Sequence, residues 1–366
     1  MNTETLKKAL QKAKPFVAPR STLPVLGNVA LYTDNGRLWV EATDLELACR
    51  IPVAHDGEFA GITVAHKVLS KIANALDCAE LDFGDEDDCL VITGTGTKAR
   101  LPGIDRDEFP PIARKSDRTL AVMGAGVLKR IATLIAPSAS TDEARPTLMH
   151  VCAELTKEGV LFVATDGFML SKLQVDAKSG DYAAIDDETT LLVPARAWKA
   201  VAGLASSANE DVTLGVILDK EGEPWMVMFT FASGAQAVVM LCQGTFPTWQ
   251  DIWPKAFTGQ AVVTGLGQAV KPLLAFADRD YLKSDWTFDE EGLVISVKSE
   301  GASMTRSVEA VTTGEPLTTH FDLILVNSLL KRGKFGGLAL RYSAEFGPTI
   351  FDMGDWATAA MPMRDR

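Results

Sequence analysis

The chain repeats one pattern of secondary structure three times, and this internal repeat constrains its fold more than any single motif. Each repeat opens with a helix, contains a second helix that follows a short apolar strand, and closes with further strands. The second helices are evenly spaced, because Val193 follows Val64 by 129 residues and Phe321 follows Val193 by 128. The predicted helices span residues 3–14, 65–76, 124–137, 194–207, 266–279 and 322–335. Pro272 predicts a kink or a late start in the fifth helix.

A hairpin is predicted between the two helices of every repeat. Apolar runs lie on either side of Asn-Gly or acidic-Gly turns, which is typical of paired antiparallel strands. The predicted strands span residues 28–32 with 38–44, 150–155 with 160–166, and 285–288 with 293–297. We therefore predict an α+β fold of three repeated domains, each with two helices on antiparallel sheets, at residues 1–117, 118–257 and 258–366.

Charge is distributed unevenly between the predicted helices and the rest of the chain. The formal net charge of −12 by itself argues against nucleic acid as a partner. The six helices, however, contain fifteen Lys and Arg residues against three acids, a balance of +12 that leaves −24 on the remainder. Each helix alone fits an ordinary solvated lysine-rich face, but a positive balance on all six predicts one surface that faces a polyanion.

Several other classes of protein are disfavoured. Five widely spaced cysteines without a C-x-x-C pair indicate neither a disulfide framework nor a zinc site. The first residues lack the apolar core of a signal peptide, and no apolar run approaches the roughly 20 residues of a membrane span, so we expect a cytoplasmic protein without a membrane partner.

Motifs for catalysis are not found in the sequence either. The four histidines show no H-x-x-x-H spacing, and there is no G-x-S-x-G or Walker motif, so we predict no catalytic residue, metal or cofactor. An unrecognised enzyme is the least favoured alternative. Asp44 and Asp166 occupy equivalent positions in two repeats, which favours a structural role in a turn over catalysis.

Four short segments carry the most specific pattern in the chain, and they are Leu23-Pro24-Val25-Leu26-Gly27-Asn28, Ala164-Thr165-Asp166-Gly167, Phe246-Pro247 followed by Pro254, and Met361-Pro362-Met363-Arg364. In this order, within a threefold repeat, they resemble the bacterial DNA polymerase III beta subunit, the sliding clamp family. The resemblance implies a processivity factor that does no chemistry. It implies a head-to-tail homodimer, which is a pseudo-sixfold ring of clamp domains around duplex DNA of any sequence.

The resemblance also permits a check of the size of such a ring. Twelve helices about 10 Å across would form a circle about 38 Å wide at the helix axes, with a hole of about 28 Å that admits a hydrated duplex. The helical cations and Arg20, which matches a DNA-contacting position in the family, are the predicted DNA-binding residues. The helical set comprises Lys7, Lys8, Lys12, Lys71, Lys129, Arg130, Arg196, Lys199, Lys271, Lys331 and Arg332. The loop from Ser138 to Arg145 is a further candidate.

A second implied site is an apolar cleft for short peptides of the DNA polymerase III alpha subunit, the clamp loader and other proteins with a clamp-binding motif. The matching positions are Leu148, Thr165, Gly167, Phe168, Met169, Leu170, Pro247, Ile252, Pro348, Met361, Pro362, Met363 and Arg364. The resemblance further implies dimer contacts at the domain 1 edge and beside the first helix of domain 3, at Lys98, Ala99, Leu101 and Phe276.

The chain departs from the family pattern in the implied cleft. Phe168 and Met169 stand where His or Tyr and then Arg are usual, Asp251 stands where Arg is common, and the chain continues through Asp365-Arg366. We expect one wall to be more apolar and the other less basic. The alternative role for Phe168 and Met169 is plain core packing. The alternative function for the protein is an accessory clamp or interaction scaffold with altered partner specificity.

Overall fold

A computed structural model describes residues 1–18, 20–55, 57–176, 182–184, 189–277, 282–299, 301–333 and 337–364. The chain forms two compact units. Unit 1 comprises Met1–Lys129, Glu154–Val160 and Val175–Gln243, and unit 2 comprises Arg130–Ala153, Leu161–Gln174 and Gly244–Arg366. The division passes through the second repeat, so the predicted boundaries of three domains stay a prediction.

All six predicted helices form, and they are α1 (Thr3–Ala13), α2 (His66–Ala75), α3 (Ala125–Arg130), α4 (Ala195–Ala202), α5 (Leu266–Phe276) and α6 (Leu323–Leu330). α3 continues as a π-helical turn, Ile131–Ile135, and a 3-10 turn, Ala136–Ser138. α5 begins at Leu266 with Pro272 inside it, so the late start is wrong. The predicted helix ends at 278–279 and 334–335 lie outside the described residues. Among the described residues, no helix combines the length and apolar character that crossing a bilayer requires.

Unit 1 is built on one long antiparallel sheet. Its strands are β1 (Asn28–Asp34), β2 (Arg37–Thr43), β3 (Leu47–Ala54), β4 (Ile62–Ala65), β5 (Leu81–Glu86), β6 (Cys89–Gly94), β7 (Thr97–Asp105), β8 (Arg118–Gly124), β12 (Tyr182–Ala184), β14 (Asp211–Leu218), β15 (Pro224–Phe231) and β16 (Gln236–Met240). The strand order is β12-β8-β14-β15-β16-β3-β2-β1-β4-β7-β6-β5. Ala237 of β16 pairs with Cys49 of β3, and this pairing joins the first and second repeats in one sheet.

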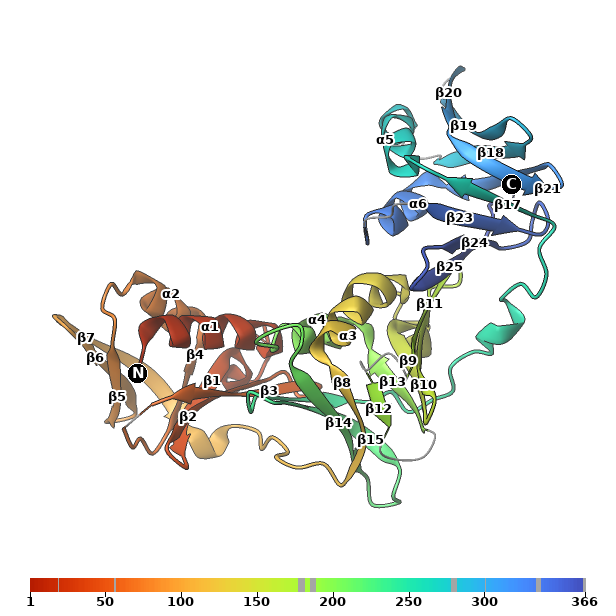
Figure 1. The fold of residues 1–366 in the computed structure, drawn as a ribbon. Coiled ribbons are helices and arrows are strands. Elements are labelled where there is room, and N and C mark those ends of the chain that lie inside the picture. The colour runs from red at the N-terminus through yellow and green to blue at the C-terminus, as the bar shows by residue number, and fades with distance from the viewer. Residues whose placement is uncertain are drawn as a thin grey trace. The chain divides into compact units, whose positions relative to one another are not determined.

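The helices of unit 1 bury their apolar faces on this sheet. Asn2 caps α1 by accepting from the backbone N–H groups of Glu4 and Thr5, and Leu6 and Leu10 point into the core. α1 packs against α2 and over β2 and β3. α4 follows β13 (Thr189–Pro194) and packs Trp198 edge-on against Phe229 of β15. In Figure 1, α1, α2 and α4 lie on the same side of the unit 1 sheet.

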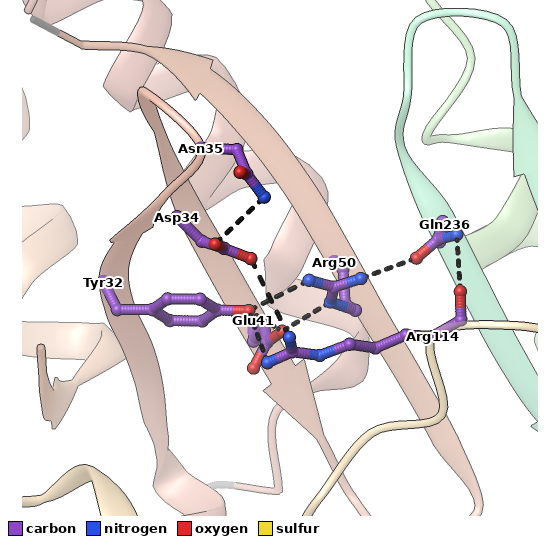
Figure 2. Close-up of polar contacts among 7 residues, drawn as sticks. All are labelled: Tyr32, Asp34, Asn35, Glu41, Arg50, Arg114 and Gln236. Atoms are coloured by element: carbon purple, nitrogen blue, oxygen red, sulfur yellow. Dashed lines mark hydrogen bonds and ion pairs between the residues drawn. The ribbon is translucent and has the colours of Figure 1, made fainter.

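A buried ionic network reinforces the junction between the first two repeats (Figure 2). Arg50 Nε lies 2.6 Å from Glu41 Oε1, and both side chains are almost fully buried. Tyr32 donates its hydroxyl to Glu41, and burial raises the pKa of this phenol. Arg50 also donates to Gln236 of β16, whose amide donates to the carbonyl of Arg114. The network therefore ties the β1–β3 strands to β16 and to the connection that precedes β8.

Unit 2 contains two sheets. Its strands are β9 (His150–Thr156), β10 (Gly159–Thr165), β11 (Met169–Asp176), β17 (Gly259–Val263), β18 (Lys283–Asp289), β19 (Gly292–Ser299), β20 (Ala302–Val308), β21 (Ala310–Gly314), β22 (Leu317–Asp322), β23 (Leu338–Tyr342), β24 (Thr349–Asp352) and β25 (Trp356–Ala360), with the unit division passing through β9, β10 and β11. The larger sheet runs β13-β9-β10-β11-β25-β24-β23-β17-β21, and the smaller runs β20-β19-β18-β22.

The packing of unit 2 follows from these sheets. Ser171 of β11 pairs with Thr358 of β25, which joins the second and third repeats as β3 and β16 join the first two. Trp286 packs edge-on against Phe321 and Phe351 in the core. The strands of the three predicted hairpins, β1–β2, β9–β10 and β18–β19, pair as expected, which confirms them.

Candidate functional site

Helices of unit 1 place exposed lysines on one face of the sheet. Lys8 of α1, Lys71 of α2 and Lys199 of α4 are all exposed, as is Lys129 of α3. α1, α2 and α4 share one side of the sheet (Figure 1), so the exposed lysines of these three helices belong to the helix-covered side. Such flexible point charges suit contact with phosphates and do not read bases. Arg20 is also exposed, in the turn that follows the first helical segment.

Four other predicted DNA contacts are already engaged with protein groups. Lys7 forms an ion pair with Glu4 at 2.8 Å. Lys12 is half-buried, donates to the carbonyl of Leu204 at 2.7 Å, and has a pKa lowered by burial. The remaining two are arginines, with Arg130 lying 3.5 Å from Asp355, and Arg196 pairing with Asp44 and Glu46. The charged groups of these four residues are therefore less available to an external anion than those of the exposed lysines.

Unit 2 brings two of the predicted lysines to one cleft. A cavity of about 330 Å³ lies between α5 and α6, and Lys271 and Lys331 both line it. Both lysines are exposed. Their convergence on one concave surface concentrates positive charge there.

Arg332 requires a correction, because its guanidinium points inward. Nη1 donates to the Ser138 hydroxyl at 2.6 Å and to the Leu134 carbonyl at 3.0 Å, and Nη2 donates to the Pro137 carbonyl. Burial lowers the pKa of Arg332 to about 10. Because both Nη atoms of this guanidinium are directed at protein oxygens, Arg332 is not available to phosphates and is not among the proposed DNA contacts. Ser138, from the candidate loop, is buried beneath it.

The second candidate site is built on the turn from Thr165 to Met169. Asp166 Oδ1 accepts from the backbone N–H groups of Phe168 and Met169, both at 2.8 Å. The Thr165 hydroxyl donates to the carbonyl of Met169 at 2.7 Å, and Gly167 has a left-handed φ of 94°. This bonding displays Phe168, whose side chain is 62% exposed.

The turn from Thr43 to Leu47 in the first repeat has the same hydrogen bonds. Asp44 Oδ1 accepts from the backbone of Glu46 and Leu47, and the Thr43 hydroxyl donates to the carbonyl of Leu47. Leu45 occupies the glycine position with a left-handed φ of 79°. The recurrence of Asp44 and Asp166 is thus explained by turn structure, as predicted.

Hydrogen bonds connect Met361, and through Arg145 also Leu148, to the turn that displays Phe168. The backbone N–H of Met361 donates to the Phe168 carbonyl at 2.8 Å. Arg145 donates to the carbonyl of Asp166 at 3.0 Å, and its own carbonyl accepts from the N–H of Leu148. Pro348 precedes Thr349, which pairs with Ala360 at the end of β25. Further along the C-terminal segment, the N–H of Met363 donates to the carbonyl of His320 at 2.9 Å, Pro362 is partly buried and Arg364 is exposed.

Exposure separates the roles of the neighbouring apolar residues. Met169 and Leu170 are only 3% and 2% exposed, so both side chains are buried next to the turn. Core packing is therefore the correct interpretation for Met169 and the wrong one for Phe168. Asp365 and Arg366, which extend the chain, lie outside the described residues.

Pro247 and Ile252 come from the segment between β16 and β17. Pro247 is exposed, and Ile252 is 42% exposed beside the short 3-10 turn Trp249–Asp251. Lys172 of β11 reaches this segment, because its Nζ lies 3.9 Å from the centre of the Trp253 ring and 5.7 Å from that of Trp249. This contact joins the segment with Pro247 and Ile252 to the strand that follows Phe168.

The predicted dimer residues lie at the end of unit 1 and on α5. Lys98, Ala99 and Leu101 belong to β7, where they pair with β6. The other edge of β7 pairs with β4 only from Gly103 to Asp105, so among the described residues the Lys98–Leu101 stretch has one edge without a strand partner. Leu101 is buried and Lys98 is exposed. Phe276, the last residue of α5, is half-buried.

Comparisons with known proteins match this architecture. The model of the DNA polymerase III beta subunit N-terminal domain matches residues 1–113, and that of its central domain matches residues 123–248, together well over half of the chain. The chain belongs to the DNA polymerase III beta subunit family.

Individual members of the beta subunit family are similar over most of the chain. The beta sliding clamp of Micrococcus luteus is 25% identical over 76% of this chain and 87% of its own length. That of Synechococcus elongatus is 25% identical over 94% and 92%. The crystal structure of the DNA polymerase III subunit beta from Pseudomonas aeruginosa superimposes with a TM-score of 0.90 at 21% identity, covering 100% of this chain and 99% of that one.

Sequence reasoning missed some residues that shape the sites of this beta subunit family member. Arg145 was predicted only as part of a candidate DNA-binding loop. In the structure its guanidinium donates to the carbonyl of Asp166, in the turn that displays Phe168. Lys172, Trp249 and Trp253 were not predicted at all. The spacing of Trp249 and Trp253, four residues apart and beside Ile252, was the one available signal.

Proposed function

We propose that this chain is a DNA polymerase processivity factor, a sliding clamp whose homodimer encircles duplex DNA and tethers replication proteins to it. Membership of the beta subunit family supports this function. The observation that carries it is the exposed lysines on helices of an otherwise acidic chain, from Lys8 and Lys71 to Lys271 and Lys331. No residue is assigned a catalytic role, and we place the protein in the cytoplasm with the DNA that it serves.

The proposed mechanism relies on topology more than on affinity. Lysines that contact phosphates through flexible chains and water make sequence-independent, salt-sensitive contacts. Such contacts permit a closed ring to move along the duplex. The closed ring itself prevents dissociation, so weak contacts are sufficient.

Ring closure requires a second copy of the chain. We propose that the free edge of β7 around Ala99 meets domain 3 of the second copy near Phe276. An antiparallel strand edge is an effective template for pairing with another chain. Light scattering tests this directly, because a homodimer has twice the 39.3 kDa of one chain. A monomer at micromolar concentration would overturn the ring.

The decisive experiment compares retention on closed and cut DNA. The clamp is loaded on a nicked circular plasmid by its clamp loader, and the plasmid is then linearised at a single site. We expect the protein to remain on circular DNA at moderate salt and to leave the linear form. Equal retention on both forms would contradict an encircling clamp.

The partner cleft is proposed around Phe168, with Leu148, Pro247, Ile252, Pro348 and the Met361–Arg364 segment. A few apolar anchors dominate binding in such grooves. We expect a peptide with the clamp-binding motif of a polymerase III alpha subunit to bind, and Phe168→Ala to weaken it. Because Phe168 is 62% exposed, the same change is expected to leave the unfolding midpoint nearly unaltered.

A second candidate function is an accessory clamp or interaction scaffold with altered partner specificity. It is favoured by the exposed Phe168 and by Asp251, an acid where the family commonly has an arginine. Isothermal titration with the polymerase-type peptide separates the two functions. Failure of this peptide to bind, with retention of a different partner that is lost in Phe168→Ala, would favour the accessory clamp or scaffold.

A further inference from the structure

The two walls of the proposed cleft are held in place by different means. The turn that displays Phe168 is fixed by backbone hydrogen bonds, including the one from Met361. Pro247 and Ile252 instead belong to the connection between β16 and β17, outside the strands of either sheet. A contact that holds this connection against β11 therefore sets the distance between the two walls.

Lys172 provides such a contact. Successive residues of a strand point to opposite faces, so Lys172 shares the face of β11 on which Leu170 of the cleft lies. Its ammonium group lies over the Trp253 ring at 3.9 Å and near the Trp249 ring at 5.7 Å, both within the range of cation–π attraction. Trp249 is only 8% exposed, so the aromatic side of the contact is itself anchored.

The acidic groups near Lys172 already have cationic partners, which makes the ammonium group of Lys172 depend more on its contact with the tryptophan rings. A cavity of about 430 Å³ is lined by Lys172, Trp253, Arg341, Asp352 and Asp355 among others. Asp352 lies 2.8 Å from Arg341, and Asp355 lies 3.5 Å from Arg130, so both acids have cationic partners of their own. Burial lowers the pKa of Lys172, with Asp352 opposing this effect, as expected for a partly desolvated ammonium group.

We propose that Lys172 is a positioning residue for partner binding. Its cation–π contact with Trp253 and Trp249 holds Pro247 and Ile252 at the distance from Phe168 that a bound peptide requires. This proposal rests on the proposed function of the cleft. It assigns the specificity of the cleft partly to a residue that touches no peptide.

Methionine and arginine at position 172 distinguish the cation–π contact of Lys172 from simple apolar packing. Lys172→Met keeps the length and apolar contact of the side chain but removes the charge, whereas Lys172→Arg keeps the charge and the attraction to the rings. We expect Lys172→Met to weaken binding of the polymerase-type peptide about tenfold, which corresponds to about 1.4 kcal/mol. Lys172→Arg is expected to bind within about threefold of the wild type. Lys298→Met, at an exposed position on β19, is the matched control.

A second measurement reports the position of the connection without any peptide. Lys255 is exposed just after Trp253 and provides a trypsin site within the connection. We expect Lys172→Met to accelerate cleavage after Lys255 several-fold under native conditions and Lys172→Arg to restore the slow rate, since proteolysis reports local opening.

The two measurements separate failure of this proposal from failure of the proposed function. A Lys172→Met variant with the cleavage rate and the peptide affinity of the wild type would overturn the proposed positioning role of Lys172. An equal loss of peptide affinity in Lys172→Met and Lys172→Arg would overturn it as well. If the wild type binds no clamp-motif peptide, the proposed partner function fails, and the cleavage rates still decide whether Lys172 positions the connection.

Discussion

Arg332 Nη1 lies 2.6 Å from the hydroxyl oxygen of Ser138, and this contact places a cation inside unit 2. Ser138 in turn hydrogen bonds to Ser171 at 2.6 Å, and Ser171 hydrogen bonds to Thr358 at 2.7 Å. All three hydroxyls are buried. The chain of bonds therefore links the second residue after α6 to the segment after α3 and to the paired strands β11 and β25.

Replacing Arg332 tests the strength of this network. Arg332→Met leaves the buried hydroxyls and the Leu134 carbonyl without their charged donor, and hydrogen bonds to charged groups contribute about 1.5–3 kcal/mol each. We expect a loss of about 2 kcal/mol in the free energy of unfolding, measured by urea denaturation. Lys331→Met, at the exposed neighbouring position, is expected to change it by less than about 0.5 kcal/mol. Equal effects of the two changes would contradict the buried network.

The fold was largely predictable because each repeat carries its signals locally. Helical spacing and Asn-Gly or acidic-Gly turns are short-range patterns, and they placed all six helices and the three hairpins. The pairings of β16 with β3 and of β11 with β25 were not predicted, because strand pairing between repeats depends on side chains far apart in the sequence.

The candidate sites were predictable to a smaller extent. Charge identified lysines such as Lys271 and Lys331, which line one cavity. It also selected Arg332, because composition cannot distinguish a cation that faces solvent from one that faces buried hydroxyls. Lys172 was not predicted to belong to a site, because the tryptophan rings that it contacts are 77 and 81 residues away in the chain.

The two equivalent turns allow a reciprocal test of backbone strain. Leu45 has a left-handed φ of 79°, which costs a residue with a side chain about 1–2 kcal/mol, and the gain from glycine is reduced by its greater freedom in the unfolded chain. We expect Leu45→Gly to raise the free energy of unfolding by about 0.5 kcal/mol.

The reverse change is expected to destabilise the second turn. Gly167→Leu introduces the same strain at a φ of 94°, and its Cβ would lie 3.1 Å from Arg145 Nη1, so we expect a loss of about 1–2 kcal/mol. Urea unfolding curves of both variants measure the two effects. Changes of the same sign in both would refute the equivalence of the turns.

The pKa of Lys172 predicts how stability depends on pH. Burial lowers this pKa in the folded protein below the ordinary lysine value of about 10.4. Between the folded and ordinary values the unfolded chain binds more protons, so the stability of the wild type rises with pH across that interval. Arginine stays charged throughout. We therefore expect the wild type to gain stability relative to Lys172→Arg between pH 7.5 and pH 10.5 in urea unfolding. A constant difference between the two would show that the pKa is not lowered.

The lysine pair between α5 and α6 predicts the salt dependence of DNA binding. Lys271 and Lys331 line one cavity, and each phosphate contact contributes about 0.9 to the slope of log affinity against log salt concentration. If both contact phosphates, the double change Lys271→Ala and Lys331→Ala reduces that slope by about 1.8, measured by fluorescence anisotropy on a duplex of any sequence. Lys220 and Lys298, two exposed lysines outside the helices, provide the control pair. Alanine at the control pair is expected to leave the slope nearly unchanged, because contact with DNA is assigned to the helices, and a slope reduced equally by both pairs would mean that DNA senses only the net charge of the protein.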